Sequence, residues 1–153
     1  MSHEHIFDCR VVWVGVEKST AFDYESYSRE LTIDCKGKAQ LRASAAPVFR
    51  GDGALWNPED LLVASLSACH CLSYLAQCAR SGVGVLGYED RARGEMEHKN
   101  GAIRFVVVHL RPRVILAASA DREKALALHA RAHHDCFIAN SVNFPVRNEP
   151  EIV

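Results

Sequence analysis

The feature that most constrains this chain is a long apolar segment over residues 56–82, WNPEDLLVASLSACHCLSYLAQCARSG. Its start carries helix-initiation signals, because Asn57 can cap the backbone, Pro58 suits the first turn, and Glu59 places negative charge at the positive end of the helix dipole. Gly82 is a typical stop signal. Apolar residues fall on nearly every face between these ends. We therefore predict a long central helix that is covered on nearly all sides by a protein core or a subunit interface.

A helix of this length could also cross a membrane, since roughly 20 apolar residues suffice. Ser65, His70 and Gln77 interrupt the apolar run, and such weakly polar residues fit a protein core better, so we expect no membrane partner. The 153 residues carry a formal charge of −1 with both signs interspersed, which indicates no nucleic-acid partner. We expect a single domain over residues 1–153. The first ten residues lack the apolar core of a signal peptide, which predicts a cytoplasmic protein.

Strand signals flank the central helix on both sides. Runs of β-branched and aromatic residues before it predict an antiparallel meander, and later alternating runs predict two more strands joined by a hairpin turn. An amphipathic second helix begins with a capping box at Ser119. Pro145 and Pro150 permit only an edge-type terminal strand. The fold class is α+β, with antiparallel sheets around the long buried helix and a second helix. The predicted strands cover residues 9–16, 27–35, 38–44, 84–97 and 102–116, with the turn at 98–101.

The six cysteines should be mostly reduced in a cytoplasmic protein, so each is assessed for reactivity. Cys69 and Cys71 do not form a metal or redox pair, because residues two apart on a helix point about 200° away from each other. We interpret Cys71 and Cys78 as small core residues. Cys9 and Cys35 fall in predicted strands, where core packing is the favoured interpretation.

Cys69 and Cys136 differ from the other four cysteines. Cys69 lies inside the predicted helix among small neighbours that leave room beside its sulfur, and Cys136 follows the second helix, where a bend can present it. A reactive thiol needs an electropositive and partly accessible environment, which the residues alone do not establish. A functional pair and two unrelated core thiols both remain open at this point.

Three features occur together in this chain. They are the motif Asn57-Pro58-Glu59-Asp60-Leu61-Leu62, the motif Ser67-Ala68-Cys69-His70, and Cys136, which lies 67 residues after Cys69 with Asn140 four positions further on. Together these features resemble a divergent branch of the OsmC/Ohr family of thiol peroxidases. The order of elements is also similar along essentially the whole chain. The resemblance implies an OsmC-like fold and an enzyme that reduces hydroperoxides, organic ones preferentially, with no bound cofactor. Cys69 would attack the peroxide, and Cys136 would resolve the resulting sulfenic acid as a disulfide.

The family's glutamate corresponds to Glu59, although a charge that meets the helix dipole needs no catalytic role. In the family an arginine pairs with that glutamate and with the reactive thiolate. Arg29 is our first choice for it and Arg50 our second, while an ordinary solvated strand residue is the alternative interpretation of Arg29. The relatives imply a dithiol reductant such as a lipoyl group. The chain departs from many relatives in lacking a proline directly after Cys136.

Helix geometry adds a prediction about assembly. Glu59 and Cys69 are ten residues apart, so their Cα atoms lie about 15 Å apart along a helix axis. A long arginine or a second chain must then complete the site, and we expect an intertwined two-fold homodimer with reactive sites where the subunits meet, as the resemblance also implies. The alternative function is a non-catalytic OsmC-like protein that acts as a thiol redox sensor or binds an apolar ligand.

The histidines near Cys136 suggest a metal site. His129, His133 and His134 precede this thiol, and imidazole with thiolate is a ligand set that zinc uses. Histidines in the last turn of a helix also interact favourably with its dipole without any ligand. We expect no metal.

Overall fold

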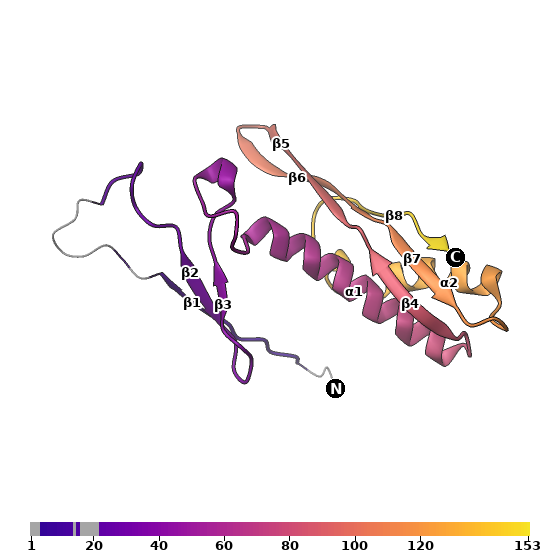
Figure 1. Cartoon of the computed structure of the whole chain (residues 1–153). Helices are drawn as coiled ribbons and strands as arrows, with labels where there is room; N and C mark the ends of the chain where they lie inside the picture. Colours follow the sequence, from indigo (N-terminus) through magenta and orange to yellow (C-terminus); the bar gives the residue numbers. More distant parts are fainter. Residues whose placement is uncertain (1–3, 14, 16–21) are drawn as a thin grey trace. The chain divides into compact units, whose positions relative to one another are not determined.

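The computed structural model describes residues 4–13, 15 and 22–153 (Figure 1). The chain divides into two compact units, Met1–Leu61 and Leu62–Val153. Each unit is described by itself, and the single domain over residues 1–153 stays a prediction. The α+β fold class is confirmed by the two α-helices and three small sheets found among the described residues.

The first unit contains the predicted antiparallel meander. Its strands are β1 (Arg10–Trp13), β2 (Leu31–Asp34) and β3 (Leu41–Ala43), in the order β1-β2-β3, and the short helix η1 (Pro47–Phe49) follows. All three strands are shorter than predicted, and positions 14 and 16 of the expected first strand lie outside the described residues. β2 is the central strand of this sheet, so β1 and β3 are its two edges.

The helix α1 (Pro58–Arg80) begins as predicted. The Asn57 side chain accepts a hydrogen bond from the backbone N–H of Asp60 at 2.8 Å and donates one to the Asp60 carboxylate at 2.7 Å. This reciprocal pair satisfies a backbone donor that the first helical turn would otherwise leave free. Gly82, with φ 68°, lies just beyond the helix end, where the left-handed conformation favours glycine.

The second unit by itself does not cover its part of α1 on nearly all sides. The buried residues form one stripe at helical spacing, while Leu72 is 69% exposed. By length and composition α1 could cross a membrane, but the core helix of a soluble protein passes the same test, so this is weak evidence. What covers its other faces stays a prediction. The stripe consists of Leu66, His70, Tyr74, Gln77 and Cys78.

The second unit has two three-stranded sheets, in the orders β4-β7-β9 and β5-β6-β8. They are mainly antiparallel, as predicted, and the two short C-terminal strands add parallel pairs at the edges, where Pro145 and Pro150 are tolerated. Asn100 (φ 53°) and Gly101 (φ 79°) form the predicted hairpin turn, since such turns need positive φ at both central residues. The strands are β4 (Val85–Asp90), β5 (Arg93–Lys99), β6 (Ala102–Leu110), β7 (Pro112–Leu116), β8 (Val146–Asn148) and β9 (Glu151–Ile152).

Each long strand predicted for this unit is divided between the two sheets, which the sequence pattern did not indicate. The chain leaves one sheet and enters the other after Asp90 and again at Arg111. The Asp90 carboxylate accepts the backbone N–H of Arg111 at 2.7 Å and the hydroxyl of Ser67 at 2.6 Å. These bonds tie the crossing point to α1, and Pro112 has no N–H with which to continue the ladder.

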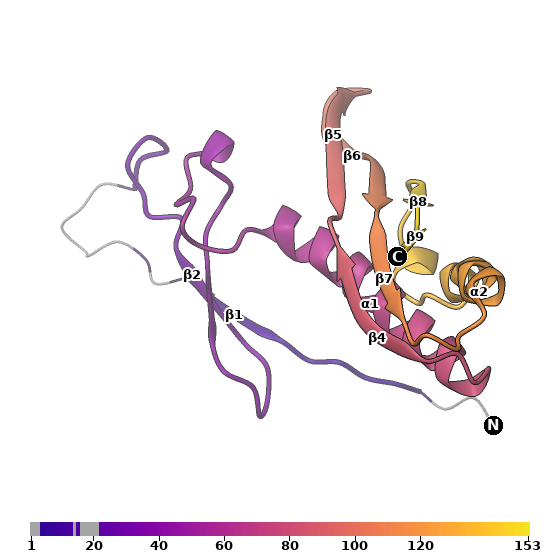
Figure 2. The same cartoon turned by 45° about the vertical axis from the view of Figure 1, so that its right-hand side comes forward.

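The second helix, α2 (Arg122–His134), is capped by Asp121, not by Ser119 as we predicted. The Asp121 side chain accepts the backbone N–H of Lys124 at 3.0 Å, while a turn closed by Ala117 and Ala120 precedes it. Figure 2 shows α1 and α2 beside the sheet that holds β7. Tyr74 of α1 and Val114 of β7 belong to one core cluster, and Ala125 and Ala132 of α2 join it.

Candidate functional site

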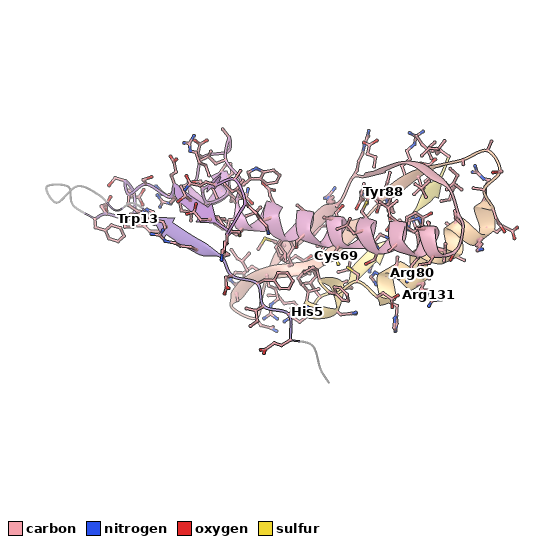
Figure 3. All side chains as sticks on the ribbon, turned by 90° about the horizontal axis from the view of Figure 1, so that it is seen from below. His5, Trp13, Cys69, Arg80, Tyr88 and Arg131 are labelled. Carbon is pink, nitrogen blue, oxygen red and sulfur yellow. The ribbon has the colours of Figure 1, made fainter. Side chains whose placement is uncertain are left out.

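The second unit brings Cys69 and Cys136 together. Cys69 lies on α1 and is half-buried, and Cys136 follows α2 and is only 1% exposed. The two side chains are near enough for Cys69 to affect the protonation of Cys136, although 67 residues separate them in the sequence. Figure 3 shows Cys69 on the helix. Two thiols in contact, one of them partly open to solvent, have the arrangement that disulfide formation requires.

The environment of Cys136 controls its protonation. Burial is the main cause that raises the pKa of this thiol to about 11, and the hydrogen bond and the charge of Cys69 act in the same direction. The backbone N–H groups of Ala139 and Ile138 bond to the sulfur and lower its pKa. Cys136 is therefore a neutral thiol at neutral pH, with two donors ready to stabilise its thiolate.

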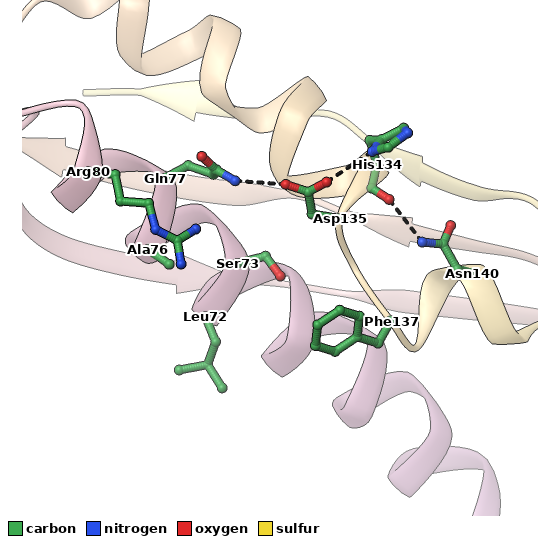
Figure 4. A pocket seen from close by; sticks show the side chains of 9 residues that line it. All are labelled: Leu72, Ser73, Ala76, Gln77, Arg80, His134, Asp135, Phe137 and Asn140. Atoms are coloured by element: carbon green, nitrogen blue, oxygen red, sulfur yellow. Dashed lines mark hydrogen bonds and ion pairs between the residues drawn. The ribbon is translucent and has the colours of Figure 1, made fainter. Parts of the chain in front are cut away.

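Side chains fix the segment that carries Cys136. Gln77 of α1 donates to the Asp135 carboxylate at 2.7 Å, and the other oxygen of that carboxylate is 2.9 Å from His134 Nδ1 (Figure 4). Asn140 donates its side-chain N–H to the His134 carbonyl at 2.9 Å, and its backbone N–H bonds to the Cys136 carbonyl at 3.0 Å. The bend around Cys136 is therefore anchored on both sides.

An open groove of about 630 Å³ lies between α1 and this segment. Leu72 and Phe137 line it and are 69% and 79% exposed. Among the residues that the structure describes, neither Cys69 nor Cys136 lines the groove itself, although each is close in sequence to residues that do. The lining residues are Leu72, Ser73, Ala76, Gln77, Arg80, His134, Asp135, Phe137 and Asn140.

Glu59 lies in the first unit, in the first turn of α1. The residue is half-buried, and its Oε2 atom is buried without a hydrogen-bond partner among the described residues. A buried carboxylate oxygen normally has a partner. This unpaired acceptor is the feature of Glu59 that the helix-dipole interpretation leaves unexplained.

Arg29 also lies in the first unit, in the loop before β2. Its guanidinium donates to the backbone carbonyls of Tyr27 and Tyr24 at 2.8 and 2.7 Å, and it lies 4.1 Å from the centre of the Tyr27 ring. Arg29 therefore lies half-buried in a loop and not on a strand, and a role without catalysis stays the alternative. Arg50 forms an exposed ion pair with Glu25. The roles that we expect for both arginines stay predictions.

The aromatic residues around Arg29 line a pocket of about 510 Å³ within the first unit. Arg29 and Arg50 both lie over the Tyr24 ring, at 5.3 and 5.6 Å from its centre. A guanidinium over an aromatic face is held there by cation–π attraction. The lining residues are Trp13, Phe22, Tyr24 and Tyr27.

Sequence reasoning missed a buried histidine pair. His70 Nε2 lies 3.1 Å from His129 Nδ1, and the Tyr74 ring stacks on His129 with centres 3.8 Å apart. Burial, with lesser charge effects, lowers the pKa of His70 to about 4 and that of His129 to about 3. Helical spacing was the available signal, because His70 is four residues from both Leu66 and Tyr74.

The histidines that suggested a metal site do not converge. His129 faces His70, while His134 is largely exposed and pairs with Asp135. Within residues 4–13, 15 and 22–153, no three histidine, cysteine or acidic side chains are grouped closely enough to hold a metal ion.

The core-packing interpretation is wrong for Cys9, which is exposed, whereas Cys35 is half-buried at the turn after β2.

Together these features define an α+β protein with two contacting thiols, one on the central helix and one after the second. The family of OsmC-like proteins matches residues 51–151, and the chain belongs to it. An OsmC-like protein of unknown function from Vibrio cholerae is 32% identical, with 98% of this chain and 100% of that one covered and a TM-score of 0.88. No curated protein matches the sequence.

Two further solved structures share the fold at lower identity. An organic hydroperoxide resistance protein from Legionella pneumophila is 15% identical, with coverage of 97% and 98% of the two chains and a TM-score of 0.68. One from Bacillus subtilis is 18% identical, with coverage of 96% and 98% and a TM-score of 0.62. The family resemblance and the OsmC-like fold inferred from the sequence are thereby confirmed.

Proposed function

We propose that this protein is a thiol-dependent peroxidase that reduces organic hydroperoxides, with Cys69 as the nucleophile and Cys136 as the resolving thiol. The single observation that carries the proposal is that these two thiols lie close enough to act on each other's protonation. Membership of the OsmC family supports it, because structural relatives include organic hydroperoxide resistance proteins. The aromatic residues that line the pocket beside Arg29 are consistent with an organic substrate.

The reaction proceeds in three steps. The Cys69 thiolate attacks the terminal peroxide oxygen, the O–O bond breaks, and the alcohol leaves with one proton, so that Cys69 becomes a sulfenic acid. The Cys136 sulfur then attacks the Cys69 sulfur, and water leaves as the disulfide forms. A dithiol reductant, such as a lipoyl group, exchanges with this disulfide and returns both thiols. No cofactor takes part.

Oxidation of Cys69 would make the thiolate form of Cys136 more favourable. A sulfenic acid in its neutral form has no charge to oppose a thiolate on Cys136, and the N–H groups of Ala139 and Ile138 still favour that thiolate. The resolving thiol is therefore kept protonated before the first step and becomes easier to deprotonate after it.

Glu59 and Arg29 complete the proposed site. The guanidinium would favour the thiolate and stabilise the charge that develops on the departing oxygen. The unpaired Oε2 of Glu59 is an acceptor that could orient it. We propose that a homodimer assembles these groups, which is consistent with the exposed Leu72 on α1. Sedimentation tests the shared site: a 17 kDa species with full activity would refute it.

We propose a cytoplasmic location for this protein. The deciding experiment therefore measures turnover of cumene hydroperoxide with a dithiol reductant under reducing conditions near neutral pH. Sustained reduction by the wild type supports the peroxidase. A single oxidation of Cys69 and Cys136 without turnover would overturn it in favour of a thiol redox sensor. Absence of any thiol oxidation would instead favour the non-catalytic binder of apolar ligands.

A further inference from the structure

The register of the first sheet places two other cysteines opposite each other. β1 and β2 are antiparallel, and the pair at the end of their ladder where β1 begins and β2 ends is Arg10 with Asp34. Each step along such a ladder moves one residue back on one strand and one residue forward on the other. Continuing the register by one step therefore sets Cys9 opposite Cys35.

This position suits a covalent link. Residues directly opposite each other on antiparallel strands have Cα atoms about 4.5–5.5 Å apart, and disulfides span Cα distances of about 4.4–6.8 Å. Cys35 also begins a tight turn, closed by a hydrogen bond of 3.0 Å from the Lys38 N–H to the Cys35 carbonyl. The turn holds the backbone of one partner in place, so little movement is needed to form the bond.

Both thiols are accessible to reagents. Cys9 is exposed and Cys35 is half-buried, whereas Cys78 and Cys136 are buried. Thiol–disulfide exchange requires such access. Both residues belong to the first unit, whereas Cys69 and Cys136 belong to the second, so this pair is separate from the proposed catalytic thiols.

We propose that Cys9 and Cys35 form a second redox pair, a modification site at which small disulfides such as oxidised glutathione generate a cross-strand disulfide. One protein thiolate attacks a sulfur of the small disulfide, whose S–S bond breaks, so that a protein–glutathione mixed disulfide forms and the first glutathione leaves as a thiolate. The second protein thiol then attacks this mixed disulfide and releases the second glutathione. Two protein thiols are oxidised to one disulfide, and one glutathione disulfide is reduced to two thiols.

The bond would act on the edge strand β1, which four residue pairs hold to β2. In the reduced protein, opening of these pairs frees the strand together with the residues that precede it. In the oxidised protein, the link at the end of the ladder prevents this opening. The redox state of the pair thus controls how often the N-terminal strand detaches.

The test uses a full-length Cys69→Ser, Cys136→Ser variant, so that the proposed catalytic pair cannot contribute. After equilibration with reduced and oxidised glutathione, peptide mapping should find an intramolecular Cys9–Cys35 disulfide. Glutathione that remains on Cys9 without a link to Cys35, bonds between chains, or a bond from either thiol to Cys71 would overturn the proposal. This outcome does not depend on peroxidase activity.

A second measurement follows the strand itself. Trypsin cleavage after the exposed Arg10 should be several-fold slower in the oxidised variant than in the reduced one, because cleavage requires β1 to detach. Adding Cys35→Ser is the matched control and should remove the difference. Equal cleavage rates in the oxidised and reduced forms would show that the bond does not restrain β1 and would overturn the proposed control.

Discussion

Cys69 and His70 are consecutive residues of α1, and each has a partner in or directly after α2. Cys69 contacts Cys136 and is half-buried, whereas His70 contacts His129 and is fully buried. One step along a helix turns a side chain by about 100°. That turn separates a thiol pair of which one member, Cys69, is partly open to solvent from an imidazole pair that is closed to it. The comparison teaches that a difference of one residue in helical phase decides which side chain of α1 is partly accessible and which belongs to the core.

The largest expected effect is on the thiol side of the comparison. Cys69→Ser should lower hydroperoxide turnover on the order of 10³-fold or more, to the uncatalysed background, because serine cannot replace the thiolate nucleophile. Cys71→Ser is the matched control, since this residue points about 200° away around the helix. Steady-state assays with cumene hydroperoxide measure both variants, and equal losses would refute the assignment.

The second prediction concerns the partner thiol. One equivalent of hydroperoxide should link Cys69 to Cys136 in the wild type, while Cys136→Ser should leave Cys69 as a sulfenic acid that oxidises further. Peptide mapping by mass spectrometry distinguishes these products. Finding Cys69 joined to Cys71 in the wild type would contradict the geometry of the pair.

The histidine side predicts how stability depends on pH. Burial lowers the pKa of His70 to about 4 and that of His129 to about 3, below the usual 6.5. Between about pH 6.5 and the lowered pKa of each histidine, the unfolded chain therefore binds more protons than the folded one. The contribution of the pair to the free energy of unfolding is complete above about pH 6.5 and is lost as the pH falls. Each imidazole should account for about 3 kcal/mol of that loss by pH 3 to 4.

Urea unfolding at several pH values measures this loss. His129→Gln should weaken the pH dependence because it removes one of the two buried titrating groups. His134→Gln should leave the dependence nearly unchanged, since that side chain is 88% exposed. A wild-type free energy of unfolding that stays constant between pH 7 and pH 4 would show that the pair does not contribute as described.

The smallest expected effect concerns the bond that fixes the segment after α2. Gln77→Ala removes the donor to the Asp135 carboxylate and should cost about 1–3 kcal/mol of stability. The step from sulfenic acid to disulfide should slow several-fold, with the initial oxidation of Cys69 unchanged. Stopped-flow measurements separate the two steps. Ser73→Ala, in the same groove, is the control, and an equal slowing of both steps would argue against a positioning role for Gln77.

Much of this protein was determined locally by its sequence. The start of α1 depends on Asn57 and on residues within three positions of it, and the turn at Asn100 and Gly101 depends on backbone preferences of those two residues. Such signals are readable because the interacting groups are close in the chain. The family motif around Cys69 carried the expected link to Cys136, which the residues alone had left open.

The tertiary structure decided what depends on distant surfaces. The division of the long strands required the Asp90 carboxylate to meet Ser67 and the Arg111 N–H, and the pairing of His70 with His129 required two helices to pack in one phase. The periodicity of apolar residues in the sequence indicates that a side chain faces the core, but it does not indicate which side chain it contacts there. The sequence by itself therefore determined the two helices, the start of α1 and the hairpin turn, whereas packing determined where the strands end and which side chains meet, because contact energy depends on both surfaces at once.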